Sequence, residues 1–257
     1  MLNYIKSECY RTGRGKGLYQ AMAILAGMVL AMNGILAAAQ RYLPDFRYGT
    51  FRFSLNTYTS MIYVLVLCGA IIPGCLFTDD RRNGVLKNAI AYGISRDKIF
   101  LGKCTVAFLF TFLILCTTLF IYVGSAWALL ENPEWLPVRE MLMGTAAALP
   151  SAVSSLVFLI LLGLLYEKET TAGLLWTTVY YLLPLACNIA GWKLDIFARI
   201  SSWMPYCFLR NEAIVTYHDY QCLWDTASGF VKCMISGFAG TAFFLIWGLW
   251  RFRRQEV

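Results

Sequence analysis

Six long apolar runs limit what this chain can fold into. A transmembrane helix needs about 20 consecutive apolar residues, and within a bilayer only a helix or a closed barrel satisfies all of its backbone hydrogen bonds. We therefore predict an all-α integral membrane protein with six transmembrane helices in a single domain over residues 1–257. The runs cover residues of about 18–39, 56–77, 101–130, 141–166, 171–190 and 231–250.

Composition supports a membrane protein. The chain is 59% hydrophobic and 14% charged, with a mean hydropathy of +0.58, whereas soluble domains average about 25% charged residues. The net charge of +7 does not indicate a nucleic-acid partner, because the basic residues lie beside apolar runs. In that position they indicate orientation in a membrane, with membrane lipid as the surrounding partner.

The basic residues also predict which way the chain is inserted. An even number of spans puts both termini on one side, and that side carries 14 of the 22 Lys and Arg residues. Four precede the first run, six lie between Asp79 and Lys103, one is Lys168, and three follow the last run. Cytoplasmic loops carry the excess of Lys and Arg, so we expect both termini in the cytoplasm.

The longest charged stretch, Asp79 to Lys103, separates the second and third runs. Asp79 or Asp80 suits the positive end of a helix dipole, Gly93 is a natural helix stop, and Ser95 suits the N-cap of the next helix. The stretch between them predicts a short amphipathic helix, which needs a surface because two turns gain little from propensity alone. That surface is lipid headgroups or another protein; the alternative is a solvated basic loop that only fixes topology. The apolar face comprises Val85, Leu86, Ala89, Ile90 and Tyr92.

This stretch resembles the cytoplasmic loop of ABC-2 type transporter permeases. In that family an acidic residue, a glycine, a leucine-rich turn and a Ser-Arg pair precede a Gly-Lys at the mouth of the third span. The corresponding residues here are Asp80, Gly84, Leu86, Ser95-Arg96 and Gly102-Lys103. The chain departs from the family in having Asp79-Asp80 where Glu is common, and Gly93-Ile94 where Pro is common.

The resemblance implies the membrane subunit of a bacterial ABC exporter in the plasma membrane. Its cargo would be a hydrophobic or amphipathic peptide or drug, as in antimicrobial peptide resistance. Two copies of a separate ATPase would supply the energy and hold ATP and Mg, and a second permease subunit, identical or homologous, would complete the pathway. The loop would be the coupling helix that docks on the ATPase through Asp80, Arg81, Arg82, Gly84, Leu86, Lys87, Ala89, Ile90, Gly93, Ser95 and Arg96. Leu86, Ala89 and Ile90 would enter a groove, with Arg81, Arg82 and Lys87 around its rim.

Two other segments are predicted outside the spans. Residues 1–17 predict a short interfacial helix, with Leu2, Ile5 and Cys9 at helical spacing. Residues 191–230 are rich in Trp and Tyr, which favour the headgroup level. They resemble the extracytoplasmic short helices between spans 5 and 6 of the family, although an ordinary loop is the alternative. Cys207 and Cys222 lie in this segment and form a possible disulfide if it faces an oxidising compartment; free thiols are the alternative.

Several chemistries are not expected on this chain. His218 is the only histidine, which excludes a histidine-rich metal site and HExxH. Gly13–Gly17 and Gly102–Cys104 both lack the Ser or Thr that follows the lysine of a phosphate-binding loop. We therefore expect no cofactor and no ATP hydrolysis on this chain. We also expect no ionisable side chain within the six runs, which argues against ion-coupled transport.

Other function classes remain open at this point. A non-transporting immunity or interaction protein that sequesters a toxin in the membrane would have the same apolar runs. A membrane enzyme is disfavoured by the expected lack of polar groups inside the spans. Two small-residue stripes predict close helix packing: Ala23, Gly27 and Ala31 in the first run, and Gly144, Ala148, Ser151 and Ser155 in the fourth.

The predicted topology can be tested by labelling single cysteines in a cysteine-free background. A cysteine at position 218 should react with an impermeant reagent from outside the cell. Cysteines at positions 87 and 254 should react only after permeabilisation, because both lie on the side of the termini. Labelling of position 87 in intact cells would contradict the six-span arrangement.

Overall fold

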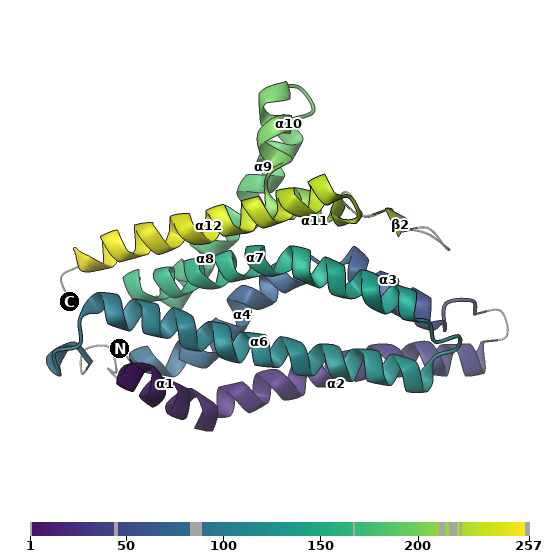
Figure 1. The fold of residues 1–257 in the computed structure, drawn as a ribbon, viewed down its shortest axis with the longest axis horizontal. Helices are drawn as coiled ribbons and strands as arrows, with labels where there is room; N and C mark the ends of the chain where they lie inside the picture. Colours follow the sequence, from purple (N-terminus) through teal and green to yellow (C-terminus); the bar gives the residue numbers. More distant parts are fainter. Residues whose placement is uncertain are drawn as a thin grey trace.

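The computed structural model of this chain describes residues 2–43, 46–82, 89–166, 168–210, 214–215, 220–221 and 223–254. It confirms the predicted all-α membrane fold: long helices lie side by side with both chain termini at one end of the bundle, here called the terminus end (Figure 1). Within the described residues, five helical segments are long and apolar enough to cross a membrane, and a bent pair of helices makes a sixth if the pair is one span. The five are α2 (Lys16–Tyr42), α6 (Arg96–Leu129), α7 (Trp135–Leu165), Glu169–Ala190 and α12 (Ala227–Arg253).

The helix pair in the region of the second run is bent, and the bend does not lie at Pro73. Helices α3 (Phe51–Ser60) and α4 (Val64–Arg82) meet at an angle of 72°, whereas α4 continues through Pro73. Three hydroxyls just before the bend donate back to carbonyls of their own helix, an arrangement that often bends helices. Thr57 bonds Phe53 O at 2.8 Å, Thr59 bonds Leu55 O at 3.0 Å, and Ser60 bonds Thr57 O at 2.8 Å.

Helix α7 is the centre of the bundle. Of its most apolar stretch, 61% is buried, against 6% for α2. Helices α4 and α12 approach it at glycines: a Cβ on Gly69 would lie 2.4 Å from Ala152 O, and one on Gly237 would lie 2.4 Å from Pro150 Cβ. The predicted packing stripe of α7 is confirmed, since Gly144, Ala148, Ser151 and Ser155 are all buried.

The small-residue stripe predicted on the first span does not pack against another described helix of this chain. Ala23, Gly27 and Ala31 are exposed on α2. Helix α2 instead contacts α6, and a buried amide ties the two helices together at the end of the bundle away from the termini. Asn33 Nδ2 donates to Tyr122 O at 3.0 Å and to Ser125 Oγ at 2.8 Å, while its Oδ1 accepts from Ser54 Oγ of α3 at 2.7 Å. This arrangement satisfies a polar side chain that is wholly buried.

The fifth span packs into the core in its first half and leaves the bundle in its second. The span consists of α8 (Glu169–Thr177), the π-helical turn η1 (Thr178–Leu182) and α9 (Leu183–Ala190). The short helices α9 and α10, light green in Figure 1, project away from the long helices of the bundle. Short elements follow, in agreement with the helices predicted for residues 191–230: α10 (Asp195–Ser201), α11 (Pro205–Arg210), the strand pair β1 (Ile214–Val215) and β2 (Tyr220–Gln221), and the 3₁₀ turn η2 (Leu223–Asp225).

Only one partner of the predicted disulfide can be described. Cys207 is buried in α11 with a free thiol that lies 3.7 Å from Pro184 O and 3.8 Å from Asn188 Nδ2. Burial raises the pKa of the Cys207 thiol above its usual value. Cys222 lies outside the described residues, as does His218, so the Cys207–Cys222 disulfide stays a prediction.

The packing around α7 predicts opposite effects of one substitution at two glycines. Gly237→Ala should lower the free energy of unfolding by about 1–3 kcal/mol, because the new methyl group meets the backbone of α7. Gly124→Ala on α6 is the matched control, since no described atom lies within 4 Å of the added carbon. Gly124→Ala should raise the free energy of unfolding by about 0.5–1 kcal/mol, because alanine favours a helix more than glycine does. Denaturant titration of the purified protein in detergent measures both, and equal effects would contradict the central position of α7.

Candidate functional site

The predicted coupling segment lies at the terminus end, and the structure describes part of it. Asp79 and Asp80 do not begin a new helix, because α4 continues through them and ends with Arg81 and Arg82. Gly84, Leu86 and Lys87 lie outside the described residues. Residues 89–91 are helical.

Gly93 ends this turn in the left-handed conformation that glycine tolerates. Its φ is +79°, its N–H donates to Ile90 O at 2.9 Å, and the N–H of Ile94 donates to Ala89 O at 3.2 Å. These two bonds are the Schellman pattern of a helix C-terminus. Ser95 then occupies the N-cap of α6, so residues 89–96 reverse direction within a single tight turn. The predicted stop at Gly93 is confirmed, and Ser95 lies at the predicted N-cap position, although its side chain makes no capping hydrogen bond.

The apolar face of this turn packs on the chain itself. Ala89 is 9% exposed and lies in a buried cluster with Phe100 and Phe252, and Ile90 packs against the same cluster. The docking role of Ala89 and Ile90 stays a prediction, but in the structure Ala89 is buried and Ile90 half-buried against residues of α6, α7 and α12. The side chain that points outward is Tyr92, which is 87% exposed.

Two polar contacts fasten the start of α6 to the end of α12. Arg96 Nη1 donates to Phe252 O at 3.3 Å. Arg253 makes a bidentate contact with Asp97, with Nε 2.8 Å from Oδ1 and Nη2 2.5 Å from Oδ2. This paired geometry fixes orientation as well as distance. The predicted site residue Arg96 thus anchors the segment within the chain.

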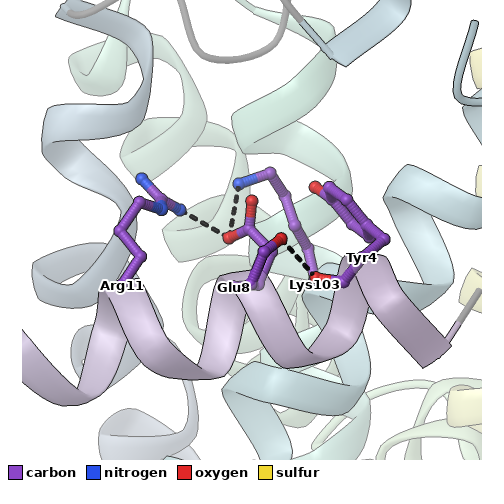
Figure 2. Close-up of polar contacts among 5 residues, drawn as sticks. Tyr4, Glu8, Arg11 and Lys103 are labelled. Carbon is purple, nitrogen blue, oxygen red and sulfur yellow. Dashed lines mark hydrogen bonds and ion pairs between the residues drawn. The ribbon is translucent and has the colours of Figure 1, made fainter. Parts of the chain in front are cut away.

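A buried ion pair fastens the same helix to α1 (Leu2–Arg14). Lys103 Nζ lies 3.8 Å from Glu8 Oε2, and the side chains are 5% and 4% exposed. Arg11 donates to the same oxygen at 2.5 Å, so two cations surround the carboxylate, as Figure 2 shows. A buried charge is tolerated when it is paired and hydrogen-bonded. The expectation of no ionisable residue within the runs was wrong for Lys103 and for Lys232, which both lie close to the end of a run.

Tyr4 completes the contact between α1 and α6. A Cβ on Gly102 would lie 2.7 Å from the Tyr4 ring, so this glycine makes room for the aromatic side chain. Burial, followed by the nearby Glu8 carboxylate, raises the pKa of Tyr4 well above its usual value, so its phenol stays neutral. The buried residues of α1 are Glu8 and Thr12. Of the predicted stripe, Leu2 is 73% exposed, whereas Ile5 and Cys9 are half-buried, as Tyr4 is.

Sequence reasoning missed Glu8, although a signal was present. A lysine inside an apolar run needs a partner, and Glu8 is the only acidic residue before the first run. The Gly102-Lys103 pair thus has a structural explanation: the glycine admits Tyr4 and the lysine pairs with Glu8. Together, α1, residues 89–96 and the end of α12 enclose the first turns of α6.

The fold defines a multi-pass integral membrane protein whose third span is clamped at the terminus end. The family model described as ABC-2 family transporter protein matches residues 4–184 of the 257. The chain therefore belongs to the ABC-2 transporter family and is a membrane permease of an ABC transporter. The match begins at Tyr4 and includes Glu8 and Lys103. No curated protein sequence is significantly similar to this chain.

The buried pair predicts a strongly non-additive double mutant. Glu8→Gln should lower the free energy of unfolding by about 3 kcal/mol, because Lys103 loses the charge that offsets its burial. Adding Lys103→Met should restore most of that loss, since no buried cation then remains at this position. Denaturant titration in detergent gives the four values of the cycle.

A solvent-accessible pair at the same end is the matched control for this cycle. Asp97→Asn removes a contact whose partner Arg253 has a side chain 64% exposed, so stability should change little. Strictly additive effects of Glu8→Gln and Lys103→Met would contradict a direct pairing.

Proposed function

We propose that this chain is the transmembrane subunit of an ATP-driven exporter in the plasma membrane of a bacterium. Both termini, and therefore the terminus end of the bundle, would face the cytoplasm. Two copies of a separate ATPase would bind ATP and Mg and dock at this end. A second permease subunit, identical or homologous, would complete the pathway. The observation that carries the proposal is the clamp on α6, together with membership of the ABC-2 family.

The clamp gives a physical route for coupling. Residues 89–96 are joined to α6 by the tight turn at Gly93, and Ala89 shares a buried cluster with Phe100 of α6. A force applied to this segment from outside would move the start of α6, because packed clusters are not continuously deformable. Helix α1 and the end of α12 would move with it through Glu8–Lys103 and Asp97–Arg253. Gly93 would be the pivot of this movement.

The packing of Ala89 and Ile90 against the chain itself changes the proposed docking face. We propose Tyr92 as the central anchor on the ATPase, with Ser95 and Lys98 beside it, since all three are exposed. Aromatic residues dominate the energetics of many interfaces. Arg81, Arg82 and Lys87 keep the proposed role of a basic rim.

The proposed cargo is a hydrophobic or amphipathic peptide or drug. A non-transporting immunity protein that sequesters a toxin is the competing function. The two differ in their dependence on a partner, because sequestration needs no ATP hydrolysis. ATPase activity that rises when the partner ATPase is bound to this subunit favours export, whereas protection that persists with a catalytically dead ATPase favours sequestration.

Tyr92→Asp tests the docking proposal. It should abolish co-purification of the partner ATPase and abolish transport, because an aromatic anchor is replaced by a charge. Expression and membrane insertion should not change, because Tyr92 is 87% exposed. Tyr42→Asp is the matched control, since Tyr42 is 79% exposed and is the last residue of α2, at the end of the bundle away from the termini.

The possible results separate the alternatives for Tyr92. Wild-type recovery of the ATPase with Tyr92→Asp would reject this anchor. Loss of the ATPase with Tyr42→Asp as well would show that the effect is not specific to the terminus end. Ile90→Asp is not a suitable test, because Ile90 packs against the buried cluster of this chain and its replacement would disturb the fold.

A further inference from the structure

An apolar cavity lies inside the bundle, away from the clamp at the terminus end. It has a volume of about 280 Å³ and is enclosed by α2, the bent pair α3–α4, α6 and α7. Leu149, Ala152 and Val153 of α7 line it. These three side chains keep accessible surface although they belong to the central, most buried helix of the bundle. The packing between the helices is therefore incomplete at this place.

Water is a poor occupant of this cavity. Aliphatic, aromatic and methionine side chains make up most of its lining. An apolar cavity of about 150 Å³ stays dry in proteins and takes up small apolar molecules instead. The cavity here is larger, and the side chains that line it have no van der Waals partners among the described residues on the side that faces the cavity. An apolar group that entered would gain those dispersion contacts.

The exposed side of the cavity lies near the middle of the long helices. Met28 is near the centre of α2, Met61 is at the bend of the second span, and Phe112 is near the centre of α6. All three line the cavity and are exposed, by 63%, 61% and 45% respectively. The medium that meets this exposed side in a bilayer is hydrocarbon rather than headgroups or water.

We propose that this cavity binds the acyl chain of a membrane lipid, which enters sideways between α2 and the bend of the second span. The lining and the position of the exposed side together select an unbranched apolar chain, because a charged or hydrogen-bonding group would lose its partners there. Met28, Met32 and Met61 suit this ligand, since flexible thioether side chains adapt to chains of different shape. The site is separate from ATPase docking and does not rest on it.

Photocrosslinking in nanodiscs tests the proposal. The protein is reconstituted in phosphatidylcholine that carries a diazirine in the middle of one acyl chain, without any cargo, and labelled peptides are mapped by mass spectrometry. The lipid should label Leu65 of α4 and Leu156 of α7, which line the cavity but are only 7% and 2% exposed. Lipid around the outside of the bundle cannot reach these positions. A phosphatidylcholine with the diazirine in its headgroup should leave both unlabelled.

A cavity-filling variant supplies the control. Ala152→Phe places a ring in the cavity and should reduce labelling of Leu65 several-fold, while labelling of exposed Phe238 on α12 stays constant. Ala242→Phe adds the same ring on the exposed face of α12 and should change neither. If Ala152→Phe does not fold, Cys68→Phe fills the cavity from α4 instead. Unlabelled Leu65 and Leu156 in the wild-type protein, or labelling that the filled cavity does not reduce, would overturn the proposal.

Discussion

Close packing around α7 is the constraint on which the rest of the structure depends. Transmembrane helices have no hydrophobic force between them in lipid, so they associate through contact area and through small residues that let backbones approach. Gly69 and Gly237 allow α4 and α12 to reach the backbone of α7 from its two sides. This leaves α2 and α6 to form a second layer, held to the bent span by the Asn33 side chain. The bend at residues 61–63 interrupts the packing between these layers, and the apolar cavity lies there.

The two ends of the bundle are held in different ways. At the end away from the termini, neutral hydrogen bonds join α2, α3 and α6 through Asn33, Ser54 and Tyr122. At the terminus end the contacts are charged, and they converge on the first turns of α6 from α1 and from α12. The two ion pairs differ in burial, since Glu8–Lys103 is enclosed while Asp97–Arg253 is open to solvent. The first therefore specifies how α1 lies on α6, and the second orients the chain end at little cost in desolvation.

The two small-residue stripes show that a local sequence pattern does not identify which helix, if any, packs against it. The stripe of α7 packs within the chain, whereas that of α2, with Ala23, Gly27 and Ala31, lies on the surface. Both patterns are equally clear in the sequence, because small residues at helical spacing indicate only that a close contact is possible. Which helix arrives at the stripe depends on the order and tilt of all six spans. The same limit applies to α1, whose apolar spacing did not indicate that the polar residues Glu8 and Thr12 would be its most buried ones.

The sequence alone determined the features that depend on neighbouring residues: the helical spans, from the length of the apolar runs, and the stop at Gly93 with the N-cap at Ser95, from backbone preference. Only the tertiary structure decided the features that join distant segments. Asp97 and Arg253 are 156 residues apart, and no local rule pairs them, or Lys103 with Glu8. It also decided that Ala89 and Ile90 face inward and Tyr92 outward, because an amphipathic turn is satisfied equally by its own chain or by a partner. The physical reason is that burial in a bundle is set by which helices meet, and that is a property of the whole chain.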